Sequence, residues 1–83
     1  MSKLNRLAIN EEGFIFDPDT GNSFTVNQTG LLIIKALKEN KTEKEILELL
    51  KEEFEVEEKE AQRDLIDFME QLKLYGLLED KNV

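Results

Sequence analysis

Residues 14–26 read FIFDPDTGNSFTV, and this stretch decides the fold. On each side of its centre, residues alternate at the two-residue period of a half-buried β-strand. Within the centre, Pro18 presets φ for a type I turn, and Gly21 readily adopts the positive φ of a bulge that closes a hairpin. The stretch therefore predicts two antiparallel strands joined by a tight turn.

The segment before this hairpin continues the same pattern. Leu7 and Ile9 are separated by one residue, and the turn-forming residues 10–13 (NEEG) follow them. We expect a preceding strand that this turn sends back antiparallel, so that three strands occupy about residues 6–26.

The patterning then becomes helical. The side-chain oxygen of Asn27 is placed to accept the backbone N–H of Gly30 and cap a helix over about residues 28–39. Six of the seven residues 31–37 are apolar, which predicts a central helix that is covered on more than one side.

Thr42 and Glu45 have the spacing of a capping box, which predicts the start of a second helix. Each side chain is expected to accept the other residue's backbone N–H, so that the helix covers about residues 43–54. A third helix is expected over about residues 58–75 and presents one apolar stripe at 100° per residue. The stripe consists of Ala61, Leu65, Phe68, Met69, Leu72 and Tyr75. Ile66 lies at the shoulder of this stripe.

The third helix is expected to end at Gly76 in a Schellman motif, with Leu77 packing back on Leu72. Leu77 and Leu78 are then expected to lie under the domain, and residues 80–83 to fray. At 83 residues the chain has room for one small domain, over residues 1–83. Strands followed by helices predict the α+β class.

The composition excludes several classes of function. The chain carries 11 basic and 19 acidic residues, and the net charge of −8 opposes binding to nucleic acid and to anionic membranes. It has no Cys and no His, which removes cysteine nucleophiles, thiolate zinc sites and the usual general base. We therefore expect no enzyme activity, no catalytic residue, no metal site and no cofactor. No apolar run indicates a signal peptide or a transmembrane helix, so a cytoplasmic location is expected.

The whole charge deficit lies in residues 39–83, because residues 1–38 carry four basic and four acidic groups. Glutamates between residues 52 and 60 form either a docking patch for a basic partner or a solvated surface, and both interpretations stay open. The order of the second and third helices also fits a winged-helix transcription regulator. However, residues 57–60 read EEKE, and these carboxylates oppose contact with phosphates.

The strand at residues 22–26 is short and contains no proline or lysine. Unpaired amides and carbonyls at such an edge recruit other chains, so an edge beside an apolar groove favours peptide capture by strand addition. Two alternatives stay open: the edge is merely too short to be harmful, or it pairs with its twin in a self-associating scaffold.

Three motifs in order resemble the PqqD-like family, the small domains known as RiPP recognition elements. They are residues 24–30 (FTVNQTG), residues 46–50 (ILELL) with 54–56 (FEV), and residues 63–72 (RDLIDFMEQL) with 76–78 (GLL). The chain departs from many members at Glu39-Asn40, where they have Asp-Gly. It also lacks the arginine-rich opening expected of a pyrroloquinoline quinone pathway protein, which argues against that particular pathway.

The resemblance implies a winged-helix-like fold, with a three-stranded antiparallel sheet followed by three helices. It implies a noncatalytic peptide chaperone that binds the leader segment of a ribosomally synthesised precursor peptide. By the same resemblance, the leader is expected to add to the third strand, in the groove against the third helix, and to be presented to a modifying enzyme such as a radical SAM protein. A monomer or weak homodimer is expected.

Carried onto this chain, the resemblance implies a peptide-binding edge and a groove wall. The edge consists of Ser23, Phe24, Thr25 and Val26. The wall consists of Gln62, Ile66, Met69, Glu70 and Lys73. Ile66 and Met69 are expected to contact leader side chains, whereas Asp64 is expected to accept a local hydrogen bond.

Overall fold

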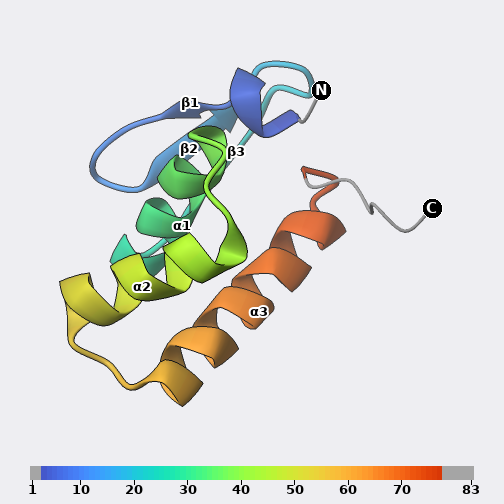
Figure 1. The fold of residues 1–83 in the computed structure, drawn as a ribbon. Helices are drawn as coiled ribbons and strands as arrows, with labels where there is room; N and C mark the ends of the chain where they lie inside the picture. The colour runs from blue at the N-terminus through green and yellow to red at the C-terminus, as the bar shows by residue number, and fades with distance from the viewer. Residues whose placement is uncertain (1–2, 78–83) are drawn as a thin grey trace.

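The computed structural model describes residues 3–77, in which strands precede helices (Figure 1). A 3-10 helix, η1, spans Lys3–Arg6, and strands β1, β2 and β3 span Ala8–Ile9, Phe14–Asp17 and Asn22–Thr25. Helices α1, α2 and α3 span Gln28–Lys38, Glu43–Phe54 and Glu58–Leu74. The strands form an antiparallel sheet in the order β1-β2-β3, and α1 packs against η1, α2 and α3. This is the predicted α+β, winged-helix-like arrangement.

The turn between β2 and β3 is held by the side chain of Asp17. Its carboxylate accepts hydrogen bonds from the backbone N–H of Asp19 at 2.9 Å and from the hydroxyl of Thr20 at 3.1 Å. Gly21 has a φ of +79°, and its N–H donates to the carbonyl of Asp17 at 2.8 Å. The predicted hairpin is therefore confirmed.

The inner face of this hairpin carries Ile15 rather than the two phenylalanines of β2. Ile15 is fully buried, whereas Phe14 and Phe16 are 55% and 45% exposed on the outer face. The register pairs Ile15 with Phe24, which packs against the core. Because side chains alternate along a strand, Asp17 also lies on the inner side, where the turn satisfies its carboxylate.

The first strand is shorter than predicted, because Arg6 belongs to η1. Leu4 and Leu7 are each 3% exposed, and both join the cluster around Ile34 of α1. The N–H of Leu7, just after η1, donates to the carbonyl of Leu4 at 3.2 Å. Residues three apart lie on one side of such a 3-10 turn, so both leucines are buried, whereas a strand would bury every second residue.

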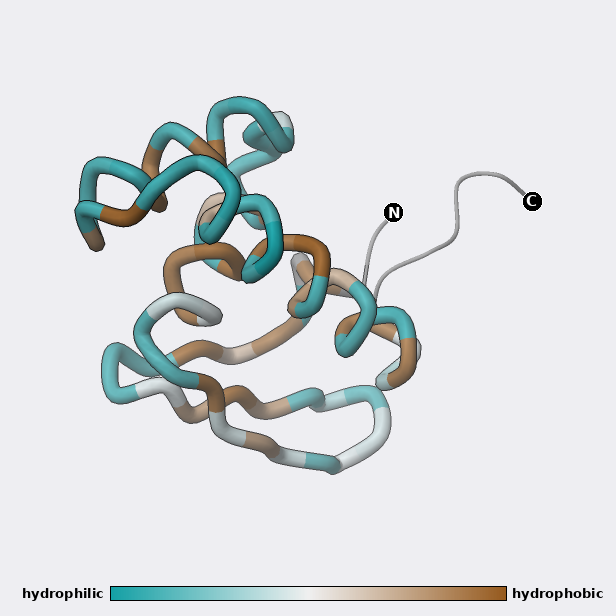
Figure 2. The backbone as a smooth tube through the Cα atoms, turned by 90° about the horizontal axis from the view of Figure 1, so that it is seen from below, coloured by the Kyte–Doolittle hydropathy of each residue, from teal (hydrophilic) through white to brown (hydrophobic). Residues whose placement is uncertain are grey.

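α1 is the central helix, as predicted. Asn27 Oδ1 accepts the N–H of Gly30 at 2.9 Å. The neighbours Ile33 and Ile34 are both fully buried, because the helix is covered on two sides. Ile34 packs with η1, β2 and the end of α3, and Ile33 packs with α2 and the start of α3. In Figure 2, long hydrophobic stretches accordingly run through the middle of the domain, and hydrophilic stretches predominate on the outer helices.

The predicted capping box at the start of α2 is confirmed. Thr42 Oγ1 accepts the N–H of Glu45 at 3.2 Å, and the carboxylate of Glu45 accepts the N–H of Thr42 at 2.8 Å. Two otherwise unpaired donors at the helix start are satisfied in this way.

The capping box makes the stability of α2 depend on pH. The hydrogen bond from the Thr42 backbone lowers the pKa of Glu45 from its ordinary value. Because the folded-state pKa lies below the unfolded-state pKa, this stabilisation is complete above the ordinary pKa and is lost as the pH falls through the folded-state pKa. We expect wild type to exceed Glu45→Gln in melting temperature at neutral pH, and this advantage to shrink in acid.

Thermal unfolding of both proteins between about pH 7 and about pH 3 measures the effect. The glutamine keeps a hydrogen-bond acceptor and does not titrate, so the difference between the two curves isolates Glu45. A difference that is independent of pH contradicts the prediction.

α3 ends in the predicted Schellman motif. Gly76 has a φ of +74°, and its N–H donates to the carbonyl of Lys73 at 3.0 Å. The N–H of Leu77 donates to the carbonyl of Leu72 at 2.9 Å, and both leucines are buried in one cluster. Leu78 and residues 80–83, for which expectations were stated, lie outside the described residues. Within residues 3–77, no helix is long and apolar enough to cross a membrane.

Candidate functional site

β3 lies at the edge of the sheet. Among the described residues it pairs with β2 on one side, and no strand pairs with its other side. The free side of a strand exposes backbone N–H and C=O groups in a row, and these groups can bind another extended chain.

The hydrogen-bond pattern shows which backbone groups face this open edge. The N–H of Val26 donates to the carbonyl of Gly13 on the β2 side at 2.9 Å. Bonded and non-bonded pairs alternate along an antiparallel ladder, so Phe24 belongs to the next bonded pair. The N–H and C=O groups of Ser23 and Thr25 therefore point away from β2, toward the open edge.

A groove of about 280 Å³ runs beside this edge, between β3, the start of α1 and α3. We call it the β3–α3 groove. It is lined by Thr25, Val26, Asn27, Thr29, Gly30, Asp64, Asp67, Phe68 and Gln71. Its apolar members are Val26 and Phe68, and its α3 rim is polar.

Gly30 brings the walls of the β3–α3 groove together. A Cβ at this position would lie 2.7 Å from Cε1 of Phe68, so any larger residue would displace the Phe68 ring. The glycine at the first turn of α1 therefore allows Phe68 of α3 to pack against α1 beside Val26, the residue that follows β3.

An aromatic pair extends the same side of α3 toward the start of β3. The rings of Phe24 and Tyr75 are tilted by 32°, with centroids 5.0 Å apart. Tyr75 was predicted to join the inward stripe, but it is 59% exposed and covers Phe24 from the outside. Such a pair offers apolar surface to a chain that lies along β3.

The structure divides the predicted site into two places. Ser23, Phe24, Thr25 and Val26 lie at or beside the open edge, as expected. The five predicted wall residues instead line a second groove, of about 420 Å³, between α2 and α3. This α2–α3 groove is lined by Glu43, Leu47, Gln62, Leu65, Ile66, Met69, Glu70 and Lys73.

The predicted position of the wall is therefore wrong. Ile66 is 62% exposed, but it lies on the side of α3 that faces α2. The helical period correctly grouped the five residues on one shoulder of α3, while the opposite shoulder meets β3. Peptide binding by these five residues stays a prediction, separate from the β3–α3 groove.

The side of α3 that faces β3 carries Asp64, Asp67, Phe68, Gln71 and Tyr75. Their spacing of three or four residues marks a single helix face, which the sequence displays once the orientation of α3 is known. Asp64 was expected to accept a local hydrogen bond. Within residues 3–77 its side chain has no such partner, and it lines the groove instead.

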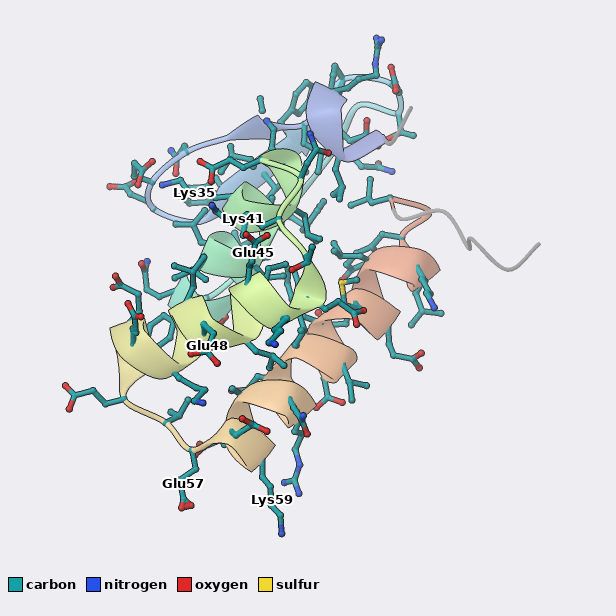
Figure 3. The ribbon with its side chains drawn as sticks, in the orientation of Figure 1. Lys35, Lys41, Glu45, Glu48, Glu57 and Lys59 are labelled. Atoms are coloured by element: carbon teal, nitrogen blue, oxygen red, sulfur yellow. The ribbon has the colours of Figure 1, made fainter. Side chains whose placement is uncertain are left out.

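The acidic connection between α2 and α3 lies away from both grooves. Lys51 Nζ contacts Glu58 at 3.3 Å and Glu48 at 3.5 Å, and these carboxylates raise the pKa of Lys51. Glu57 and Lys59 point away from the body of the domain (Figure 3). This arrangement fits a solvated surface, and a role in docking a basic partner stays a prediction. No cluster of three or more potential metal ligands occurs within residues 3–77.

The fold and the open edge define a small winged-helix-like domain with a groove beside its last strand. The family model described as Coenzyme PQQ synthesis protein D (PqqD) matches residues 12–78, so the chain belongs to the PqqD family. This confirms the resemblance read from the three motifs.

One similar solved structure is "Lasso peptide synthetase B1 complexed with the leader peptide". It superposes with a TM-score of 0.75 at 27% sequence identity, and the match covers 89% of this chain and 88% of that chain. A comparison with curated proteins gave no match.

Proposed function

We propose that this protein binds the leader segment of a ribosomally synthesised precursor peptide as an additional strand on β3. The observation that carries the proposal is the open edge, where the backbone groups of Ser23 and Thr25 face outward beside the β3–α3 groove. In strand addition, backbone hydrogen bonds provide affinity and pockets for alternate side chains provide specificity. Membership of the PqqD family and the likeness to a synthetase bound to a leader peptide support this role.

The bound leader is presented to a modifying enzyme, and the protein itself is noncatalytic. Holding the precursor beside the enzyme raises its effective concentration there without any chemistry in this chain. A radical SAM enzyme is the partner that the family resemblance favours. Strand addition to a short edge buries less surface than a standard protein interface, so micromolar affinity is expected for the isolated protein.

The proposal is tested by titrating the ¹⁵N-labelled protein with the leader of a precursor encoded beside this chain. We expect chemical shift changes at residues 22–27 and along the Asp64–Tyr75 side of α3. The amides of Ser23 and Thr25 should also exchange more slowly, because they gain hydrogen-bond partners. A scrambled peptide of the same composition is the control.

Shift changes confined to α2, or none at all, contradict the proposal. Salt-sensitive binding of duplex DNA in the same assay would instead favour a transcription regulator. A self-associating scaffold would show a dimer mass in solution without peptide.

A further inference from the structure

We infer that the β3–α3 groove selects peptides in which Lys or Arg lies two residues from an apolar residue. The inference depends on the proposed function and specifies the chemical class of peptide that the site takes. It follows from three features: the alternation of side chains along a strand added beside β3, unpaired carboxylates in the lining of the groove, and the Phe24–Tyr75 aromatic pair next to the groove.

Strand geometry determines which peptide residues face α3. In a sheet, directly opposite residues point their side chains to the same face. Ser23 and Thr25 pair with the outward residues Phe16 and Phe14, so their side chains point to the outer face of the sheet. The two peptide residues opposite Phe24 and Val26 therefore point toward α3, with one residue between them.

The peptide residue opposite Val26 meets an acidic rim. Asp64 and Asp67 both line the β3–α3 groove, and the groove lining includes no lysine or arginine. Neither carboxylate forms an ion pair within residues 3–77, although Arg63 stands four residues before Asp67. By contrast, Glu11 contacts Lys35 at 2.7 Å.

A basic side chain complements this rim in both shape and charge. Its aliphatic stem can lie on the half-buried ring of Phe68 while its charged group reaches the carboxylates. Arginine is favoured over lysine, because its planar guanidinium has several N–H donors and can bind a carboxylate through two parallel hydrogen bonds.

The peptide residue opposite Phe24 meets a different surface. There the Phe24 and Tyr75 rings lie 5.0 Å apart, and the exposed part of Tyr75 is available for contact. An apolar peptide side chain buries against this pair. The resulting pattern is one basic and one apolar residue, separated by a single residue, and a parallel or antiparallel orientation of the peptide only reverses their order.

A phage-displayed library of random twelve-residue peptides tests the inference with the intact protein as bait. Wild type is expected to enrich Lys or Arg two positions from an apolar residue. The Asp64→Asn/Asp67→Asn variant should lose the basic preference and keep the apolar one. The matched control is Glu52→Gln/Glu60→Gln, which removes two charges from exposed positions outside both grooves and should select as wild type does.

The best peptide is then compared with its Gln-substituted form by titration. Wild type should bind the basic peptide about tenfold more tightly, as expected for hydrogen bonds between charged groups. The Asp64→Asn/Asp67→Asn variant should bind the two peptides equally. The single Asp67→Asn variant provides an intermediate case if the double variant is poorly folded.

The outcomes separate the inference from the proposed function. Two outcomes overturn the inference alone, both with peptides that lose affinity for Thr25→Pro. In the first, wild type shows no preference for Lys or Arg. In the second, the Asp64→Asn/Asp67→Asn variant keeps that preference. Peptides that bind Thr25→Pro as well as wild type do not use the edge, and they overturn the proposed function and the inference together.

Discussion

Replacing Thr25 with proline is expected to weaken peptide capture strongly while the sheet stays folded. The N–H of Thr25 points to the open edge, so its removal takes away a donor that the added strand needs, and the proline ring occupies the place of that strand. Proline is tolerated on edge strands where the N–H faces solvent, and Phe24 before it is already extended. We expect a loss of affinity of about tenfold or more.

The matched control is Thr25→Val, which keeps the N–H and a branched side chain of similar shape. Peptide titrations of both variants, together with their ¹⁵N spectra, measure the effect. A proline variant that remains folded and binds as tightly as the valine variant would rule out strand addition at this edge.

The second large effect concerns stability. Leu72→Ala is expected to lower the free energy of unfolding by about 2–5 kcal/mol, since it leaves a cavity where the side chain was fully buried. Leu72 joins the end of α3 to η1, β2 and α1 in one cluster. Because a small domain is stable by only about 5–15 kcal/mol, this single change removes a large fraction of the total.

Leu74→Ala is the control on the same helix. It deletes the same atoms from a side chain that is 85% exposed, so we expect a change within about 0.5 kcal/mol. Urea unfolding followed by circular dichroism compares the two variants with wild type. Similar losses for both would contradict the placement of Leu72 in the core.

Most of the fold could be predicted because its signals are local. The turn at Asp17, the capping box at Thr42 and the Schellman motif at Gly76 each depend on contacts between residues a few positions apart. Sequence spacing alone specifies such contacts. The family resemblance could likewise be predicted, because its motifs are short and lie in order along the chain.

The wall of the groove could not be predicted in the same way. Asp64 and Ile66 lie on opposite shoulders of one helical stripe, and no local contact decides which shoulder meets β3. That choice depends on the path of the chain through α1 and α2. The apolar character of Ile66 favoured the wrong shoulder, since this side chain faces the α2–α3 groove. Gly30 was the available signal, because a residue without a Cβ at the first turn of α1 marks a close approach by another element.

The open edge of β3 turns only two residues, Ser23 and Thr25, toward an incoming chain. A strand added here gains few backbone hydrogen bonds, and this limits the lifetime of the complex as well as its affinity. At micromolar affinity and an ordinary association rate, a captured precursor departs at about 1 s⁻¹. Under the proposed function, the protein would therefore release one precursor and bind the next within seconds, because its short strand offers few hydrogen bonds to hold each peptide.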